Sequence, residues 1–558
     1  MPKTLYLTTP LYYVNAAPHI GHSYTEVAAD CLARYHRLRG REVFFLTGTD
    51  EHGQKIAQAA AAAGQPPQAF ADQMVDRFRG LWTLLNIDKH EFIRTTDPRH
   101  VQAVQAILAQ LHQAGALKQA TYQGWYCTPD ETFWTEAELG AAAPRPAASG
   151  LPRPPTSGGS PSSVAGSIPV CPACRRPLES AKEEGWYLPL ETHQGWLRKF
   201  VADHRDFVRP ESRYNELASL LEQPLPEYLC ITRPRSRVAW GIKVPFSPEH
   251  TTYVWFDALL NYITVPGYPA DRKRFDALWP ADVHFIGKDI LRHHAVYWPI
   301  MLHALGLSDA QMPRLIFAHG WWKIGEQKMS KSLGNIVDPT VVVTQLLKGQ
   351  PFAADAYRYF LLREVPFGQD GSFSEDAILK RLGADLGNDL GNLVNRTLSM
   401  IERYVGGQIP VVSQDQLDIA GADADNPLAT VALQLHGQVA SALERIEFSV
   451  ALERIMTIVS NANQYIEAAA PWKLAKASDK DSKEKLKRVL ATLADVIRIT
   501  AILLEPFMPS VAAEIWTQLG CGAQTRRWED AASWGRLHPN QRIGPHPVLF
   551  PRQEAPVS

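Results

Sequence analysis

The sequence predicts an α/β protein in which a doubly wound parallel-sheet domain is interrupted by a cysteine-bearing segment and followed by a helical bundle. Three observations carry this prediction: a strand–helix–strand unit at the start, a compositionally biased interruption flanked by cysteines, and helical periodicity after about residue 370. The chain has 558 residues. Because a single core stops growing at roughly 250–300 residues, more than one domain is expected.

The first 50 residues have the pattern of a βαβ unit. Residues 4–9 (TLYLTT) and 42–47 (EVFFLT) are rich in β-branched and aromatic residues, as short buried strands are. Between them, residues 23–39 place apolar side chains three or four apart and end at Gly40, which is typical of an amphipathic helix with a glycine stop. Strand, helix and strand in this order predict a parallel, Rossmann-like sheet.

The middle of the chain contains an interruption and then more strand-like sequence. Residues 141–168 are almost wholly Ala, Pro, Gly and Ser, with no acidic residue. Such a segment buries too little to offset its chain entropy, so we predict a disordered insertion. Beyond it, residues 251–260 (TTYVWFDALL) and 283–289 (VHFIGKD) are predicted to be further sheet strands and their exits.

After about residue 370 the pattern changes to helices. Residues 376–402 carry leucines at helical spacing, and residues 428–445, 449–469 and 484–504 behave likewise, separated by polar or proline-bearing breaks. A bundle of at least four helices is therefore predicted.

Composition narrows the class of protein. Hydrophobic residues make up 45% of the chain and charged residues 21%, and the formal net charge is -1. No global field therefore draws the chain to nucleic acid or to an anionic membrane, and any nucleic-acid surface must be local. Six cysteines in this length argue against a secreted disulfide scaffold. No apolar run approaches the roughly 20 residues of a membrane span and the first residues do not resemble a targeting signal, so a cytoplasmic protein is expected.

A first chemical motif is the turn Pro18-His19-Ile20-Gly21-His22, which follows the first predicted strand. A helix N-terminus suits phosphate, and two imidazoles beside it add hydrogen-bond donors. The glycine leaves room for a base or ribose to pack on bare backbone. Taken alone, this turn is better explained by two surface or capping histidines.

A second motif, Lys328-Met329-Ser330-Lys331-Ser332, lies between Gly325 and Gly334. Two lysines on a glycine-bounded loop can form a cationic clamp for the charge that develops on a transferring phosphoryl group. A solvated basic loop is the simpler explanation when the motif is taken in isolation. The order and contexts of the two motifs together make chance occurrence very improbable.

The pair resembles the HIGH and KMSKS signatures of class I aminoacyl-tRNA synthetases. The resemblance is closest to the methionyl-tRNA synthetase family and covers nearly the whole chain, with matching blocks TTPLYYVNAAPHIGH, FLTGTDEHGQKI, TYVWFDALLNY, HFIGKDILRHHAVYWP and GEQKMSKSLGN. It implies a catalytic domain split by a zinc-bearing connective segment, then a helical anticodon-binding domain. The implied boundaries are 1–115 and 232–320 for the catalytic halves, 116–231 for the connective segment, 321–369 for the KMSKS and stem-contact region, 370–545 for the helical domain and 546–558 for a tail.

The resemblance also implies binding residues. The positions that match the methionine side-chain pocket are Leu11, Tyr13, Trp255, Ala258, Leu259, Tyr262 and His294. Aromatic rings suit a thioether, since sulfur packs favourably at ring edges. Asp50 matches the carboxylate that receives the substrate ammonium, and Gly287 and Asp289 join His19, Gly21, His22 and Lys331 at the ATP site. Ordinary core packing would explain the aromatic residues on periodicity alone.

The implied reaction needs no protein nucleophile. Methionine and ATP form methionyl-adenylate and diphosphate, and the methionyl group then passes to tRNA(Met) with release of AMP. His19, His22, Lys328 and Lys331 are the donors expected to stabilise the transition state, with Mg²⁺ accompanying the nucleotide.

Asn392, Arg396 and Trp472 match the anticodon readers of the family. The alternative explanation is structural: Asn392 and Arg396 form a surface pair, and Trp472 packs at the end of a helix.

The connective segment carries candidate zinc ligands, Cys127, Asp130, Cys171 and Cys174. A CxxC pair beside another cysteine is typical of a structural zinc site, and carboxylate oxygen is an accepted ligand. The family more often has cysteine where Asp130 stands, and some members lack the metal. Once segment 141–168 is left out, the two half-sites are close in sequence. The competing hypothesis is a zinc knuckle in decay.

Three other functions share part of this pattern. A synthetase for leucine, valine, isoleucine or cysteine would share both signatures, but the pocket residues and the lack of room for a large editing domain argue against it. A HIGH-type nucleotidyltransferase would lack the helical domain, and a non-catalytic tRNA-binding paralogue should have decayed motifs.

The chain ends soon after the helical part, at PVLFPRQEAPVS, with no appended module of the kind that dimerises some relatives, so a monomer is expected.

Overall fold

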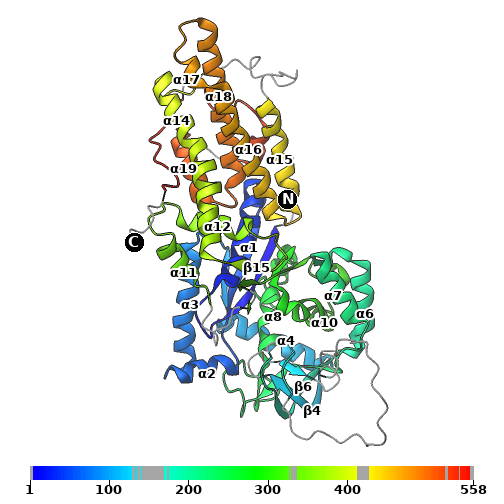
Figure 1. Ribbon diagram of the computed structural model, residues 1–558. Coiled ribbons are helices and arrows are strands. Elements are labelled where there is room, and N and C mark those ends of the chain that lie inside the picture. Colours follow the sequence, from blue (N-terminus) through cyan, green and yellow to red (C-terminus); the bar gives the residue numbers. More distant parts are fainter. Residues whose placement is uncertain are drawn as a thin grey trace, which may run out of the picture.

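The computed structural model of the chain describes residues 4–127, 132–134, 139, 169–172, 175–325, 327–328, 336–410, 427–521, 526–538 and 541–552. An α/β part carries the sheets, and a long helical part rises from one end of it (Figure 1). Within the described ranges, no helix is both long and apolar enough to cross a membrane. The predicted insertion at 141–168 lies outside the described residues.

The central sheet is wholly parallel, in the order β3-β2-β1-β11-β12-β7. Its strands are β1 Leu5–Tyr13, β2 Val43–Asp50, β3 Glu91–Arg94, β7 Val208–Arg209, β11 Val283–Gly287 and β12 Ile316–His319. The predicted strands at 4–9, 42–47 and 283–289 are confirmed. The strand order reverses between β1 and β11, and ligands of open parallel sheets bind at the carboxyl ends of the strands beside such a reversal.

Both faces of this sheet are buried, because alternate residues of each strand enter different cores. In β1, Leu7 packs into one core and Tyr6 into the other, and in β2 the same holds for Phe45 and Phe44. Helices α1 (Ile20–Leu38) and α3 (Pro67–Leu84) cover the first face, and α4 (Pro98–Gln113), α8 (Val254–Thr264) and α10 (Trp298–Ala304) cover the second. The doubly wound arrangement is therefore confirmed.

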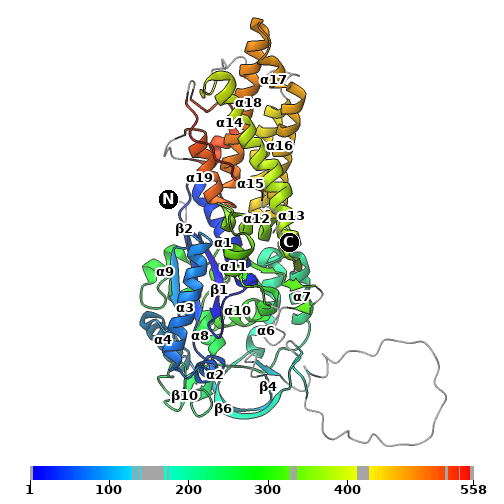
Figure 2. The ribbon, with the colours of Figure 1, turned by 60° about the vertical axis from the view of Figure 1, so that its left-hand side comes forward.

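Between β3 and β11 the chain builds an antiparallel sheet, β5-β4-β6-β8. Its strands are β4 Lys118–Cys127, β5 Thr132–Trp134, β6 Glu179–Pro189 and β8 Tyr228–Cys230. Figures 1 and 2 both place β4 and β6 at the end of the molecule opposite the helical part. Before β8, strand β7 joins the edge of the central sheet beside β12, so the range 116–231 also contributes a strand to the parallel sheet.

The smaller elements complete the α/β part. The helices are α2 Gln54–Ala62, α6 Glu191–Asp203, α7 Glu211–Leu221, α9 Arg272–Leu278, α11 Pro339–Val341 and α12 Ala353–Arg363. Two small sheets pair β9 Thr232–Pro234 with β10 His250–Thr252, and β13 Trp322–Ile324 with β14 Gln327–Lys328 and β15 Gly371–Phe373.

The prediction that residues 251–260 form a sheet strand is wrong for most of its length. The strand at this place, β10, is only His250–Thr252, and it pairs outside the central sheet. From Val254 the chain is the helix α8, most of whose residues are buried. A helix buried on nearly all sides has no polar face, so its apolar run cannot be distinguished from a buried strand by periodicity.

The helical part confirms the four predicted helical stretches. Its elements are α13 Glu375–Arg381, a π-helical segment Leu382–Gly391, α14 Asn392–Val405, α15 Pro427–Glu444, α16 Phe448–Ala469, α17 Pro471–Leu474, α18 Lys480–Leu504 and α19 Pro509–Gln518. Gly406, at φ 71°, caps α14 in the left-handed region that glycine adopts without strain.

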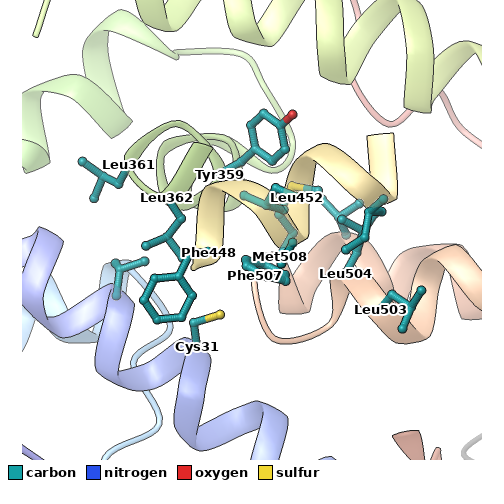
Figure 3. Close-up of a cluster of buried hydrophobic side chains, with 14 of the residues drawn as sticks. Cys31, Tyr359, Leu361, Leu362, Phe448, Leu452, Leu503, Leu504, Phe507 and Met508 are labelled. Carbon is teal, nitrogen blue, oxygen red and sulfur yellow. The ribbon is translucent and has the colours of Figure 1, made fainter. Parts of the chain in front are cut away.

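The two parts share one core (Figure 3). Leu362 of α12 and Cys31 of α1 lie close to Phe448 of α16 and Phe507, which follows α18. Arg358 crosses the same junction, fully buried, with Nη2 2.6 Å from Asp30 Oδ2 and Nε donating to Phe507 O at 2.9 Å. The ion pair joins α12 to α1 within the α/β part, and the hydrogen bond to Phe507 O joins α12 to the helical part.

Candidate functional site

The carboxyl edge of the central sheet gathers several of the predicted residues. Strands β1, β2, β11 and β12 end there at Tyr13, Asp50, Gly287 and His319. Tyr13 and Asp50 are register partners, and Asp50 is 3% exposed. The edge lies at the order reversal between β1 and β11, where a ligand site is expected.

The first motif forms the N-terminus of α1, with His19 as its N-cap. His19 Nδ1 accepts from the Gly21 N–H at 3.1 Å, and His22 Nδ1 accepts from the His19 N–H at 3.2 Å. The two rings stack with centroids 3.7 Å apart. A ring nitrogen that accepts a hydrogen bond carries no proton, so in each neutral ring the proton lies on Nε2. The pair thus offers two N–H donors at a helix N-terminus, which suits a phosphate.

The His19 ring lies so close to Gly21 that a side chain at this position would collide with it. A Cβ at this position would lie 2.9 Å from Cε1 of His19. The space above the glycine, assigned from the sequence to a bound base or ribose, is therefore bordered by the His19 ring, which folds back to cap the helix.

The second motif begins on a hairpin. β13 and β14 pair antiparallel with Lys328 opposite Lys323, and Gly325 in the connection has φ 59°. Lys331 lies outside the described residues. Where the described chain resumes, Val337 O accepts from the Ile20 N–H at 3.1 Å. One hydrogen bond therefore ties the segment that leaves the lysine motif to the first residue of the histidine helix.

The predicted methionine pocket uses one face of α8. Trp255, Ala258, Leu259 and Tyr262 stand at helical spacing i, i+3, i+4 and i+7. Leu11 of β1 packs against the core that contains Leu259 and Tyr262, and Tyr13 packs in the cluster that Trp255 borders. Strand β1 and α8 therefore border the same core, and the Tyr6 hydroxyl of β1 donates to Tyr262 O of α8 at 2.9 Å.

The polar tip of this pocket is a neutral Tyr–His pair. His294 Nδ1 lies 3.0 Å from Ile290 O, and because a carbonyl only accepts, Nδ1 is the donor. Nε2 then accepts from the Tyr262 hydroxyl at 2.9 Å. Burial lowers the pKa of His294 to about 4. Near neutral pH the pair adds polarity without charge, which fits an uncharged thioether better than a cation would.

Beside the pocket lies a buried carboxylate that the sequence analysis did not single out. Asp257 Oδ2 is 2.7 Å from His52 Nδ1, and its Oδ1 is 2.9 Å from His100 Nε2. Burial alone would raise the pKa of Asp257, but the two histidines outweigh it and hold that pKa below its ordinary value. The network joins α8 to the segments after β2 and β3. An aspartate inside an apolar run was the signal available in the sequence.

A second overlooked carboxylate lies on α1, the helix that begins with the histidine pair. Glu26, on α1 one turn after His22, is fully buried, and its Oε1 accepts from the hydroxyls of Thr9, at 2.8 Å, and Thr47. Burial raises the pKa of Glu26 to about 7. Its neighbour Tyr12 lies with its ring centroid 4.9 Å from that of His22.

The predicted nucleotide residues Gly287 and Asp289 are packed tightly together. A Cβ on Gly287 would lie 2.7 Å from Asp289 Oδ1. The same oxygen accepts from the indole N–H of Trp321 at 2.9 Å. The end of β11 is therefore fixed to the segment that enters the β13–β14 hairpin.

The three predicted anticodon residues lie together on the helical part. Arg396 of α14 has its guanidinium 6.0 Å from the centroid of Trp472 in α17, and its Nη2 lies 2.6 Å from Glu467 Oε1. Asn392 Nδ2 donates to Asn463 Oδ1 at 3.3 Å. Trp472 is half-buried, so one part of the ring packs and another part faces solvent. An arginine beside an aromatic ring offers a nucleobase stacking and edge contacts.

Two of the four predicted metal ligands are described. Cys127 and Cys171 are fully buried in one small cluster with Leu178. The chain turns directly after Cys171, where the Arg175 N–H donates to Cys171 O at 2.8 Å. Asp130 and Cys174 lie outside the described residues, and among the described residues no group of three or more candidate ligands gathers.

Comparisons with known proteins cover both parts of the chain. A family model described as tRNA synthetases class I (M) matches residues 5–398, and one described as anticodon-binding domain of tRNA ligase matches residues 428–540. A methionine--tRNA ligase of Caldanaerobacter subterraneus subsp. tengcongensis is 43% identical over 553 residues, covering 99% of this chain and 79% of the relative. That of Clostridium tetani is 41% identical over 551 residues, covering 99% and 78%.

Solved structures agree with these relatives. The Mycobacterium tuberculosis methionyl-tRNA synthetase in complex with methionyl-adenylate is 38% identical, with a TM-score of 0.87 over 99% of this chain and 100% of that one. The apo form of the same enzyme is 35% identical, with a TM-score of 0.81 over 99% of each chain. The likeness therefore extends through the α/β part and the helical part alike.

Proposed function

The chain belongs to the methionine--tRNA ligase family of class I tRNA synthetases, and from that membership we propose how its own residues carry out the reaction. The enzyme activates methionine with ATP as methionyl-adenylate, releasing diphosphate, and then transfers the methionyl group to tRNA(Met), releasing AMP. The α/β part performs the activation, and the helical part binds the tRNA anticodon.

One hydrogen bond carries the assignment of the ATP site. Because Ile20 N donates to Val337 O, the histidine pair and the segment after the lysine motif stay close to each other. We assign to the phosphates the Nε2–H groups of His19 and His22, together with Lys328 and Lys331. Gly21, Gly287 and Asp289 border the nucleotide, and Mg²⁺ comes with ATP. Preorganised donors at the transferring phosphorus act where charge develops.

The methionine side chain is proposed to lie between β1 and α8. The uncharged Tyr262–His294 pair sits at the polar tip of this pocket, and rings suit the sulfur. Asp50, at the end of β2, is assigned to the substrate ammonium. Held in this way, the methionine carboxylate attacks the α-phosphorus of ATP in line, the bond to the diphosphate breaks, and no protein nucleophile is required.

The activity is tested by methionine-dependent ATP–pyrophosphate exchange. We expect exchange with methionine alone among the standard amino acids. Comparable exchange with leucine, isoleucine, valine or cysteine would assign the chain to a different synthetase. No exchange with any amino acid, in protein that still binds tRNA, would identify a non-catalytic tRNA-binding protein.

The anticodon is proposed to be read by Asn392, Arg396 and Trp472. Arg396 lies beside the Trp472 ring, while Asn392 stands one turn earlier on α14. A base can stack on the ring and meet the two polar side chains at its edge. The alternative, a purely structural tryptophan, predicts equal damage to activation and to aminoacylation when Trp472 is replaced.

A structural zinc ion is proposed to be held by Cys127, Asp130, Cys171 and Cys174. Two buried thiols in one cluster, with a tight turn after Cys171, support it. Metal analysis of the purified protein tests for its presence, and Asp130→Ala against Asp130→Cys tests the ligand. If the alanine variant retains zinc as tightly as the parent, Asp130 is not a ligand.

We also propose that the enzyme acts in the cytoplasm as a monomer. Its substrate tRNA(Met) serves protein synthesis there, and the activation site is assembled from one chain. Cell fractionation and sedimentation of the purified protein test the two statements, and a stable dimer at working concentration would contradict the second.

A further inference from the structure

Asp370, just before β15, accepts hydrogen bonds from three donors. Lys288 Nζ is 2.6 Å from its Oδ1, Lys323 Nζ is 2.8 Å from its Oδ2, and the Trp321 N–H donates to Oδ1 at 3.0 Å. Burial alone would raise the pKa of Asp370, but the two ammonium groups and the amide outweigh it and hold that pKa well below its usual range. The carboxylate therefore stays charged across the working pH range.

The two lysines belong to different parts of the activation site. Lys288 directly follows Gly287 at the end of β11, and its ammonium lies 4.2 Å from the Trp321 ring centroid. Lys323 is the central residue of β13 and stands opposite Lys328 in the register of the hairpin. Asp370 thus joins the nucleotide end of the central sheet to the hairpin that leads into the lysine motif.

The backbone around Asp370 leaves little room for movement. Gly371 N donates to Trp321 O at 2.8 Å, so β15 is hydrogen-bonded beside the carboxylate. A Cβ on Gly320 would lie 2.2 Å from Gln369 O, which shows how closely the two segments approach. The carboxylate is therefore held in place by backbone contacts on both sides.

We propose that Asp370 is a positioning residue for the activation step, which fixes the β13–β14 hairpin relative to the nucleotide end of β11. Its single negative charge lies between two ammonium groups and reduces their mutual repulsion, and the strand ending at Lys328 keeps its place as a result. The inference rests on the proposed function, because it assumes that this hairpin presents its lysines to ATP. Loss of a partner of a partly buried charge leaves that charge uncompensated.

The test is Asp370→Asn, which can still accept from the Trp321 N–H but has no charge for the lysines. We expect kcat for ATP–pyrophosphate exchange to fall at least about tenfold and KM for ATP to rise, since even a ~1 Å misplacement can cost on the order of a hundredfold. KM for methionine should stay unchanged, because Asp370 binds Lys288, Lys323 and Trp321, while the methionine pocket is assigned to β1 and α8. A merely structural role would lower thermal stability and move both KM values together.

Asp282→Asn is the matched control. Asp282 precedes the opposite end of β11, where it pairs with Arg314 at 2.8 Å and accepts the Tyr6 N–H at 2.8 Å. Because the arginine of this pair is exposed and the asparagine can still accept the Tyr6 N–H, exchange should stay within about twofold of the parent. If Asp370→Asn behaves like this control, the inference is wrong. If the unaltered protein shows no methionine-dependent exchange, the proposed function fails first.

A double variant tests whether the unbalanced charge, and not the altered side-chain shape, causes the loss of activity. Adding Lys323→Met to Asp370→Asn removes one uncompensated ammonium, so it should restore part of the exchange activity lost in the single variant. Equal or lower activity in the double variant would contradict the inference. Should Asp370→Asn fail to fold, Lys323→Met alone is expected to raise KM for ATP, and an unchanged value would overturn the proposal.

Discussion

The proposed activation site and the proposed anticodon site are assembled in different ways. The first draws on β1, α1, β2, α8, β11 and the hairpin after β12, which are separated by hundreds of residues and meet at the carboxyl edge of the sheet. The second draws on α14 and α17, where two of its residues are a single helical turn apart. One site depends on strand order, and the other depends mainly on helix spacing.

The two sites also differ in burial. In the activation site, Tyr262 and His294 are each 1% exposed and hydrogen-bonded to each other. In the anticodon site, the side chains of Arg396 and Glu467 are 31% and 62% exposed. Exposed ion pairs contribute little, while a buried group that loses its partner costs about 1–3 kcal/mol. Single replacements should therefore affect stability and activity more in the first site than in the second.

The largest effect is expected for His22→Ala. Removing a preorganised donor should lower kcat for ATP–pyrophosphate exchange by roughly a hundred- to a thousandfold. Binding of tRNA(Met), measured by filter retention, should be unchanged, because the helical part is untouched. His22→Asn is the control, since its amide oxygen can accept the His19 N–H in place of Nδ1. Full activity in the asparagine variant would mean that the helix start, and not the Nε2 donor, matters.

Trp472→Ala should weaken aminoacylation of tRNA(Met) and spare activation. Stacking on one base contributes roughly 1–3 kcal/mol, which corresponds to about a 5- to 150-fold loss of kcat/KM for tRNA. Exchange with methionine and ATP should stay within the error of the assay. Trp472→Phe keeps a stacking surface and should recover most of the loss. Equal losses in aminoacylation and in ATP–pyrophosphate exchange would show that the two sites do not act separately.

Tyr262→Phe is expected to raise KM for methionine. The change leaves His294 Nε2 buried without its donor, at a cost of about 1–3 kcal/mol. Because the pair lies in the side-chain pocket and not at the phosphates, kcat for exchange should change little, which is the pattern of uniform binding. A fall in kcat with KM unchanged would place the pair at the reacting centre instead.

The smallest effect is a pH-dependent change in stability for Glu26→Gln. The pKa of Glu26 is about 7 in the folded protein against an ordinary 4.5. The folded state therefore keeps a proton that the unfolded chain releases, so this contribution to stability is complete below pH 4.5 and is lost as pH rises through 7. Compared with the parent, the glutamine variant should gain a few degrees in Tm between about pH 5 and 8. A difference in Tm that does not vary with pH would contradict the raised pKa of Glu26.

Patterns along the chain predicted much of both regions. Helical spacing at 376–402, 428–445, 449–469 and 484–504 and the first βαβ unit were confirmed because each depends on local periodicity and stop signals. The segment 251–260 failed because a helix buried on nearly all sides has no polar face to report its period. Yet Trp255, Ala258, Leu259 and Tyr262, which were named from the family resemblance, are spaced as on one face of a helix. Their spacing therefore already indicated a helix here.

The sequence by itself determined the two signatures, the family they belong to and the helices of the anticodon part, because these depend on residue type and short spacing. Tertiary structure alone decided which distant groups meet: Ile20 with Val337, Asp257 with His52 and His100, and Asp370 with Lys288 and Lys323. It also decided that Glu26 is buried, which raises its pKa. The physical reason is that burial and charge pairing depend on the order of strands in the sheet, and no local pattern encodes that order.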